Sequence, residues 1–526
     1  MNLSRAPANS SSAWTPIEPV APKITTERRL EAMALSSQKE LILGLDLGTS
    51  SLKGIFCTYT GEIVAKYEIP LTLHRRGEEV EQDGQEYLTA LSSFVNQARS
   101  DENLFERVGA IGLSGHTPSL VGVDKNGAPT FPVLIWQDNR AVVEARELSE
   151  HFGDPAQYIG TSLPWTPSGT AAKAMWVARN HPEWRDKTRW LLQPKDFLGF
   201  HLTGEAISDA WSTKGLCNVR TSKTLTDLLH FTGWDPEVVP KLNDGFSVQG
   251  FTTSECKEKF GIPSGIPVSV GWSDAMCGML ALGVFRQTSS FIITGTSAIV
   301  GTSSAIEPAS EEPLYVIPLG SAPLPVTFGP TQMSGGSISW AAELFSITQG
   351  QLVERGANDK SESVPTYLPY IAGERAPLWR SDIRGSFANI SVEHGASAFA
   401  RATMEGICFA ERQVLEISQR LSSTANTEVI LSGRAGNDPH WLATRLRTMG
   451  QPLRVVDDLE ITCRGSAILA HSLLTENLTE STTALAVTGE LHNPSAEDLD
   501  YGARNYERFR VAQQRLLSKV SDETTP

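Results

Sequence analysis

A short apolar strand that ends in a glycine turn rich in hydroxyl side chains occurs twice in this chain of 526 residues. The first copy spans residues 42–50 and the second spans residues 290–298. Each copy leads into another apolar segment, which predicts two strands joined by a tight turn. Single hydrophobic cores stop growing beyond roughly 250–300 residues, so a chain of this length needs about two domains. We therefore expect two similar domains, each containing one copy.

Strand and helix patterns alternate along the chain, which predicts the α/β fold class. Residues 42–65 indicate a run of three strands, and residues 85–98 have helical spacing. We place the first domain at residues 41–262 and the second at residues 263–519. Residues 1–40 are rich in Ser, Ala, Pro and Glu and are predicted to be a disordered extension, whereas residues 520–526 form a polar tail.

The charge balance limits the classes of partner. The chain carries 45 basic and 60 acidic residues, a formal net charge of −15. This excess of acid argues against a broad surface for nucleic acid or for an anionic membrane, although an anionic substrate can still bind at a locally positive site. The six cysteines form no C-x-x-C pair, and no apolar run is long enough to cross a bilayer. We therefore expect a cytoplasmic protein with reduced thiols.

The glycine turns carry residues that suit phosphoryl transfer. In the first copy, Asp46 ends the strand, and Gly48, Thr49 and Ser50 form the turn. Glycine lets backbone N–H groups approach a phosphate, and a carboxylate at a strand end suits Mg²⁺ held through water. Residues 294–296 repeat the arrangement. We predict two phosphate loops that grip one nucleotide, with ordinary hairpin turns as the alternative.

Asp274 lies at a strand-to-helix junction in the segment Gly-Trp-Ser-Asp-Ala. An aspartate in such a place is often only the N-cap of the helix. The functional interpretation is a general base that takes the proton of the accepting hydroxyl during phosphoryl transfer. The chain has neither a Walker phosphate loop nor a G-x-G-x-x-G fingerprint, which excludes those two classes of nucleotide-binding protein.

An ordered set of short motifs resembles the FGGY carbohydrate kinases, a family that includes xylulokinases, ribulokinases, glycerol kinases and gluconate kinases. The segments that carry the resemblance are GLDLGTSSLK (44–53), IWQDNR (135–140), KAMWV (173–177), PKDFL (194–198), LPYIAGERAP (368–377) and SGRAGN (432–437). Each motif is modest alone, but the ordered set is specific. The resemblance implies two actin-like (ribonuclease H-like) domains around a central cleft for ATP, Mg²⁺ and substrate.

The resemblance also implies roles for individual residues. Asp274 corresponds to the catalytic base, and Asp46 lies near the metal. The residues implied in nucleotide binding form three loops and comprise Gly48, Thr49, Ser50 and Lys53, then Thr294, Gly295 and Thr296, then Gly433, Arg434, Ala435 and Asn437. Homodimers are frequent in this family, so a homodimer is a further expectation.

The residues expected to bind the acceptor differ from those in the corresponding motifs of two well-known subfamilies. Thr117 and Pro118 stand where xylulokinases carry Met-His and glycerol kinases carry Arg-Glu. Ala275 follows the predicted base, where those enzymes have Asn or Gln. The parts of the motif that determine specificity therefore differ from both subfamilies, and the substrate does not follow from the resemblance.

Four other residues are predicted, with Asp274, to contact the substrate. His116 and Thr117 occupy the loop that binds substrate in the family, with a loop histidine bonded to backbone as the alternative for His116. Asp138 and Arg140 resemble the acceptor side of the family, with a surface salt bridge between them as the alternative.

We predict ATP-dependent phosphorylation of a hydroxyl on a small sugar or polyol, with a pentulose such as xylulose first and a polyol or sugar acid next. The rival class is a non-catalytic sugar or nucleotide sensor on the same scaffold. Asp46 and Asp274 argue against a sensor, whereas the altered acceptor loop favours it. A cytoskeletal or chaperone protein of the actin-like superfamily is disfavoured, because the motifs are those of sugar kinases. The expected partner is the small-molecule substrate, with neither nucleic acid nor membrane.

Overall fold

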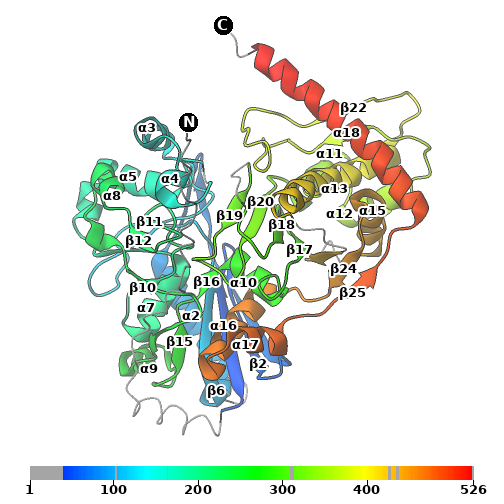
Figure 1. The fold of residues 1–526 in the computed structure, drawn as a ribbon. Helices are drawn as coiled ribbons and strands as arrows, with labels where there is room; N and C mark the ends of the chain where they lie inside the picture. The colour runs from blue at the N-terminus through cyan, green and yellow to red at the C-terminus, as the bar shows by residue number, and fades with distance from the viewer. Residues whose placement is uncertain are drawn as a thin grey trace, which may run out of the picture.

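The computed structural model describes residues 39–100, 103–162, 164–308, 313–423, 428–433 and 438–523. Two seven-stranded sheets dominate these residues, one from each half of the chain (Figure 1). The predicted disordered extension lies outside the described residues up to residue 38.

The first sheet has the strand order β14-β15-β6-β1-β2-β3, with β16 also paired to β6. The bounds of its strands are β1 (Leu41–Leu47), β2 (Ser51–Thr58), β3 (Ile63–Pro70), β6 (Val108–Gly115), β14 (Val248–Phe251), β15 (Pro267–Ser269) and β16 (Trp272–Ser273). Strands β1, β2 and β3 form the predicted antiparallel run, whereas β6 lies parallel to β1 on its other side.

The second sheet repeats this topology. Its strands are β17 (Ser290–Thr294), β18 (Ala298–Ser303), β19 (Tyr315–Ile317), β20 (Val326–Pro330), β23 (Val429–Ser432), β24 (Leu453–Val456) and β25 (Glu490–His492). From β20 to β25 the pairings are antiparallel twice, parallel twice and antiparallel once, which is the order found from β3 to β14. The two copies of the strand–turn feature thus begin two sheets of one topology, and the predicted α/β class is confirmed.

The chain passes from one sheet to the other later than the predicted domain boundary between residues 262 and 263. Strands β15 and β16 still pair with β6 of the first sheet, and β17 opens the second. Helix α10 (Asp274–Ala281) lies in the connection between them. The boundary itself stays a prediction, but the pairing of β15 between β6 and β14 assigns residues 267–269 to the first sheet.

Smaller strands and outer helices complete both halves. The short strands are β4 (His74–Arg76), β5 (Glu79–Gln82), β7 (Val121–Val123), β8 (Val133–Leu134), β9 (Trp190–Leu192), β10 (Ile207–Ser208), β11 (Cys217–Asn218), β12 (Lys223–Thr224), β13 (Lys241–Leu242), β21 (Thr366–Leu368) and β22 (Ser386–Ala388). The outer helices include α3 (Val142–Phe152), α5 (Thr170–Asn180), α6 (Pro182–Arg185), α8 (Thr226–Thr232), α11 (Gly335–Leu344), α12 (Gln349–Ala357), α13 (Ala396–Leu421), α15 (Pro439–Met449) and α17 (Leu478–Leu485). The last helix, α18 (Ala496–Glu523), continues past its predicted end near residue 519.

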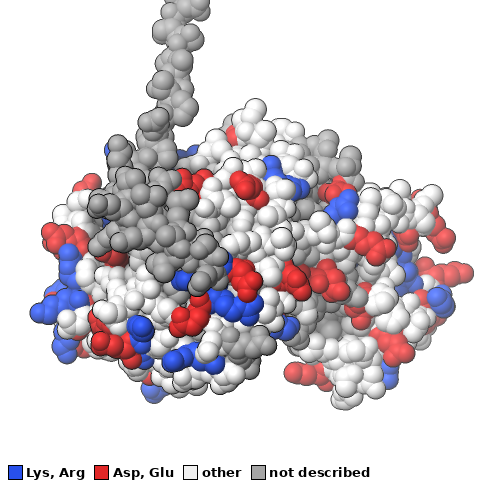
Figure 2. All heavy atoms as spheres, turned by 90° about the horizontal axis from the view of Figure 1, so that it is seen from below, with Lys and Arg blue, Asp and Glu red and all other residues white. Residues whose placement is uncertain are grey.

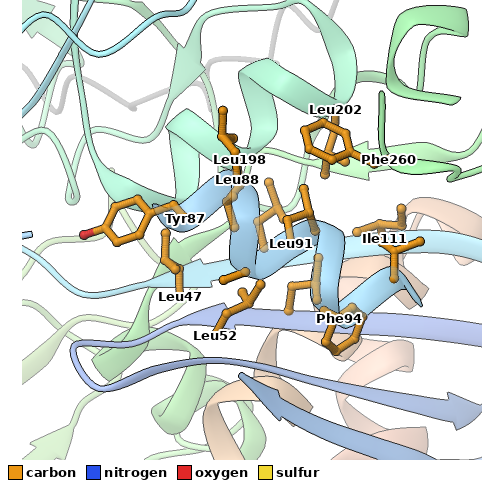
Figure 3. Close-up of a cluster of buried hydrophobic side chains, with 14 of the residues drawn as sticks. Leu47, Leu52, Tyr87, Leu88, Leu91, Phe94, Ile111, Leu198, Leu202 and Phe260 are labelled. Carbon is orange, nitrogen blue, oxygen red and sulfur yellow. The ribbon is translucent and has the colours of Figure 1, made fainter. Parts of the chain in front are cut away.

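Helix α2 (Gly84–Ser100) covers one face of the first sheet and confirms the helix predicted at residues 85–98. Figure 3 shows Leu88, Leu91 and Phe94 of α2 in the same buried cluster as Leu47 and Leu52 of the sheet. Helices α7 (Pro194–Thr203) and α9 (Ser254–Phe260) supply further apolar side chains to this cluster. The helical spacing read from the sequence therefore marks the face of α2 that faces the core.

Helix α16 (Ile461–Thr475) comes from the end of the second half, yet it packs on β1 and β6 of the first sheet (Figure 1). Glycine permits this approach. A Cβ atom added at Gly112 would lie 1.7 Å from the carbonyl oxygen of Ser466, and one added at Gly44 would lie 2.1 Å from that of Cys463. On α16 itself, a Cβ at Gly465 would lie 1.9 Å from a backbone oxygen of α10. The halves are therefore joined by direct backbone packing.

The surface agrees with the charge balance. On the face drawn in Figure 2, acidic and basic side chains are interspersed and no broad basic area appears. Within the described part of the chain, the search for a helix of sufficient length and apolarity to cross a membrane finds none.

We expect Gly112→Ala to destabilise the protein by about 2–3 kcal/mol or more. The new methyl group would clash with the backbone of α16 at Ser466, and a backbone cannot move aside as a flexible side chain can. The matched control is Gly350→Ala in α12, where nothing lies within 4 Å of the added Cβ. This control should be neutral or stabilising by up to about 1 kcal/mol. Thermal and urea denaturation of both variants would check the expectation, and equal stability of the two would contradict it.

Candidate active site

The predicted base and the predicted metal residue lie at one edge of the first sheet. Asp46 on β1 pairs with Ser114 on the parallel strand β6, and Ser114 pairs in turn with Trp272 on β16. These three residues form a row across adjacent strands whose carboxyl ends point the same way. Asp274 follows Trp272 by two positions and begins α10. The topology thus brings Asp46 and Asp274 to the same edge.

The Asp46 carboxylate is bound by both halves of the chain. Its Oδ1 accepts a hydrogen bond from the Ser114 hydroxyl at 2.7 Å, and its Oδ2 accepts one from the Thr462 hydroxyl at 2.9 Å. Thr462 lies in the first turn of α16, and sequence reasoning did not identify it. Burial raises the pKa of Asp46, and the two hydroxyl donors oppose that shift.

Asp274 is the first residue of α10, and Ser273 is the N-cap of that helix. Asp274 Oδ1 accepts a hydrogen bond from the backbone N–H of Ala275 at 2.7 Å. The pKa of Asp274 is raised to about 7, chiefly by burial and then by the negative charge of Asp46, whereas the Ala275 N–H and the positive charge of Lys214 oppose the rise. A carboxyl group whose pKa is near neutral is suited to accept a proton at physiological pH.

The first predicted phosphate loop is held by its neighbours. Gly48 N–H donates to the Ser51 carbonyl at 3.0 Å, which closes the turn. The Trp136 indole N–H donates to Thr49 Oγ1 at 2.9 Å, and Ser50 is exposed. Lys53 forms ion pairs at 3.7 Å with Glu68 and with Glu460. The loop is therefore ordered, and the Lys53 ammonium is engaged with carboxylates of the protein.

The second predicted loop lies against two other turns. Thr294 Oγ1 donates to the Ser432 carbonyl at 3.0 Å, and the Gly295 carbonyl accepts from the Gly335 N–H at 3.0 Å. The Thr296 carbonyl accepts from backbone N–H groups at the start of α11. These contacts bring residues 294–296, 334–336 and 432–433 together.

The predicted adenine and ribose loop is described only at its first residue. Gly433 has a positive φ of 104°, and a Cβ there would lie 2.3 Å from the Thr294 carbonyl oxygen. Glycine is therefore required for this close approach. Arg434, Ala435 and Asn437 lie outside the described residues.

The two loop systems meet at α10 and α16. A Cβ added at Gly278 of α10 would lie 3.3 Å from Ile293, the residue before Thr294, and 3.3 Å from Ile461, the residue before Thr462. Ile293, which precedes the second loop, and Ile461, which precedes Thr462, thus both pack against Gly278. This packing places elements of both sheets around the same short helix.

The predicted contact of His116 with substrate is not favoured by the geometry. Its imidazole is 1% exposed, with Nδ1 at 2.8 Å from Ser119 Oγ and Nε2 at 3.5 Å from the Tyr87 hydroxyl. Burial lowers the pKa of His116 to about 3, so the ring is neutral at pH 7. Thr117, by contrast, is partly exposed and lies beside Lys214, with 3.5 Å between Oγ1 and Nζ.

Asp138 and Arg140 bind one another inside the first half. Arg140 Nη2 lies 2.7 Å from Asp138 Oδ2 and 2.7 Å from Glu81 Oε1, and Asp138 also accepts from the Val80 N–H at 2.7 Å. Asp138 is fully buried. The geometry therefore favours the salt-bridge interpretation over a substrate contact, although the pair is buried and not on the surface as the alternative assumed.

Lys214 is the residue near the predicted base that sequence reasoning missed. It carries no motif of its own, and only the fold brings its ammonium beside Thr117 and within electrostatic reach of Asp274. A lysine in the loop after β10 gave no signal, because charged loop residues are usually solvated.

The donor set fits a magnesium ion that arrives with a nucleotide. Searching the residues that the structure describes for three or more His, Cys, Asp or Glu able to hold a metal returns no group. Mg²⁺ at nucleotide sites is usually held by one or two carboxylates together with phosphates and water. Asp46 supplies such a carboxylate, and its negative charge beside Asp274 is one that a cation would neutralise. Asp46 is thus the residue that would hold the ion.

Comparison with known proteins assigns the family. The model of the FGGY family of carbohydrate kinases, N-terminal domain, matches residues 41–281, and the C-terminal domain model matches residues 290–473. A xylulose kinase of Lactococcus lactis subsp. lactis is 28% identical over 412 residues, which cover 76% of this chain and 81% of that protein.

Solved structures share the fold. A crystal structure described as a "xyloylose kinase" from Brucella ovis has a TM-score of 0.83 at 24% identity and covers 91% of this chain and 99% of its own. A gluconate kinase from Lactobacillus acidophilus has a TM-score of 0.82 at 20% identity and covers 90% of this chain and 98% of its own. With both domain models matched in order over most of its length, this chain belongs to the FGGY family of carbohydrate kinases.

Proposed function

We propose that this carbohydrate kinase transfers the γ-phosphoryl group of ATP to a hydroxyl of a small sugar, with Asp274 as the general base. The observation that carries the proposal is the position of Asp274 at the start of α10, at the same sheet edge as Asp46 and the first glycine turn. Its raised pKa, near 7, supports the assignment.

In the proposed reaction the acceptor hydroxyl loses its proton to Asp274, and its oxygen forms the new bond to the γ-phosphorus. The bond from that phosphorus to the oxygen bridging it to the β-phosphate breaks, and ADP leaves with the electron pair. Asp46 would hold Mg²⁺, which neutralises charge on the phosphates when bound. The turns at residues 48–50 and 294–296 would supply backbone and hydroxyl donors to the phosphates.

The remaining nucleotide contacts are part of the same proposal. Gly433, next to the second loop, would lie beside the adenosine together with the neighbouring residues of its motif. Lys53 would have to exchange its ion pairs with Glu68 and Glu460 for a phosphate contact. A cytoplasmic location and a homodimer stay predictions.

The acceptor is proposed as a pentulose such as xylulose, a choice favoured by relatives that carry the name xylulose kinase. A polyol or a sugar acid is the alternative, and a gluconate kinase among the structural neighbours favours the acid. Thr117, Pro118 and Ala275 hold uncharged groups at this end, so these residues do not decide between the alternatives.

We expect Asp274→Asn to lower acceptor-dependent ADP release by about 10²–10⁴-fold, because the amide cannot accept the proton. The measurement uses a panel of pentuloses, polyols and sugar acids with ATP and Mg²⁺. ATP binding, measured separately by calorimetry, should persist in the variant. Unchanged turnover in the variant would contradict the assignment of the base, and a wild-type protein that binds ATP but turns over no acceptor would favour the sensor.

The pH profile should report the same carboxyl. Asp274 must be ionised to act as a base, and its pKa in the folded protein is about 7. Wild-type kcat/KM for a neutral acceptor such as xylulose should therefore be constant above that pH and fall about tenfold per unit below it. Steady-state assays between pH 5.5 and 9 would measure the profile, and a flat profile down to pH 5.5 would contradict the expectation.

The raised pKa should also appear in stability. Because the folded pKa lies above the usual value of 3.8, ionised Asp274 costs the folded state free energy that accumulates between about pH 4 and pH 7. Asp274→Asn lacks this cost, so the variant should melt above the wild type at pH 8, by roughly 2–4 °C for each kcal/mol relieved. The difference should shrink toward pH 5. A difference that does not depend on pH would contradict the electrostatic cause.

A further inference from the structure

Lys214 lies in the loop between β10 and β11 and points toward the predicted acceptor loop. Its Nζ donates to the Trp211 carbonyl at 3.2 Å and lies 3.5 Å from Thr117 Oγ1. The ammonium also lies 5.0 Å from the centre of the Trp211 ring, which fixes its direction by a cation–π contact. The side chain is partly exposed, so a ligand can reach its end.

The Lys214 ammonium has no ion-pair partner among the carboxylates that the structure describes. The carboxylates that raise the pKa of Lys214 are those of Asp209 and Asp274. Asp209 is already paired with Lys195, with 3.0 Å between Oδ1 and Nζ. An ammonium has three donors, and the two protein oxygens near Lys214 Nζ leave at least one for a ligand.

The positive charge of Lys214 persists at neutral pH. Burial is the main cause that lowers its pKa to about 8, which is still above 7. A second ammonium lies beneath the same loop, because Lys173 Nζ donates to the Pro118 carbonyl at 3.0 Å and to the Ile135 carbonyl at 3.0 Å. Burial lowers the pKa of Lys173 to about 7. Two lysine amino groups, those of Lys214 and Lys173, thus lie beside the loop around Thr117 in a chain of net charge −15.

We propose that Lys214 is a specificity-determining residue of the acceptor site and that it favours acceptors bearing a carboxylate, such as aldonic acids, over neutral acceptors of the same length. This inference rests on the proposed kinase function. The names of the relatives favour a pentulose as the acceptor, whereas the charge at Lys214 favours the sugar-acid alternative, and the experiment below decides between the two. The physical reason is that a charge-assisted hydrogen bond formed away from bulk water is stronger than one to a neutral hydroxyl.

A purely structural role for Lys214 predicts a different effect of its substitution on the use of acids and alcohols. If the ammonium served only to hold Trp211 and Thr117 in place, its loss would affect all acceptors equally. The ratio of kcat/KM for an acid to kcat/KM for the matching alcohol separates the two roles. This ratio does not depend on the fraction of folded enzyme, because both acceptors are assayed on one preparation.

The test compares wild type, Lys214→Met and Lys214→Arg with a control, Lys187→Met, whose lysine is exposed just after α6. The acceptor pairs are gluconate with glucitol and xylonate with xylitol, and xylulose is included as the neutral ketose. Acceptor-dependent ADP release is measured with ATP and Mg²⁺. We expect the wild type to prefer each acid to its alcohol.

Lys214→Met should lower the acid-to-alcohol ratio by about tenfold to a hundredfold, chiefly through KM for the acid. Lys214→Arg should keep part of the preference, and the control should keep all of it. An unchanged ratio in Lys214→Met, or a wild type that uses xylulose and the alcohols better than the acids, would overturn the inference and leave the kinase function standing. A wild type that phosphorylates no acceptor would overturn the proposed function and this inference with it.

Discussion

The site depends on the packing of one helix from the end of the chain against the first sheet. Helix α16 reaches β1 and β6 because Gly44 and Gly112 carry no side chain where its backbone passes. The same helix brings the Thr462 hydroxyl to Asp46 and places Ile461 beside Gly278 of α10. The contact that joins the two halves therefore also orders the sheet edge that carries Asp46 and Asp274. A methyl group in this layer would disturb fold and site together.

A buried carboxylate, that of Asp46, and a partly buried one, that of Asp274, lie at this edge, and the repulsion between them suits the proposed reaction. The negative charge of Asp46 raises the cost of ionising Asp274, since like charges repel strongly where water is largely excluded. Hydroxyl donors from Ser114 and Thr462 compensate Asp46, whereas Asp274 has only the Ala275 N–H and the more remote charge of Lys214. The better compensated carboxylate suits the cation, and the less compensated one suits the proton. The proposed division of roles, with Asp46 for the cation and Asp274 for the proton, agrees with their surroundings.

The sequence predicted the parts of this arrangement that have local causes. Apolar strands followed by glycine turns, the helical spacing of residues 85–98 and the strand-to-helix position of Asp274 all depend on neighbouring residues, and each appears where it was expected. Contacts between distant segments gave no such signal. Thr462 lies 416 residues from Asp46, and the loops that carry Lys214 and Thr117 are separated by 97 residues. The inward orientation of the His116 ring likewise has a distant cause, because only the packing of Tyr87 and Ser119 reveals it, and the contact of His116 with substrate stays a prediction.

The residues proposed for phosphoryl transfer are positioned by local structure, whereas the residues proposed for acceptor specificity are brought together by contacts between distant segments. Asp274 is fixed by the first turn of a helix and Asp46 by a central strand, so both resist displacement when loops change. Thr117 and Lys214 lie on loops whose backbone belongs to neither of the two large sheets. A substitution there would alter the charge that an acceptor is proposed to meet, while leaving the sheet edge that carries Asp46 and Asp274 intact. The family's motifs can therefore persist on a scaffold whose acceptor loop has changed, and the acceptor has to be inferred from charge and geometry at that loop.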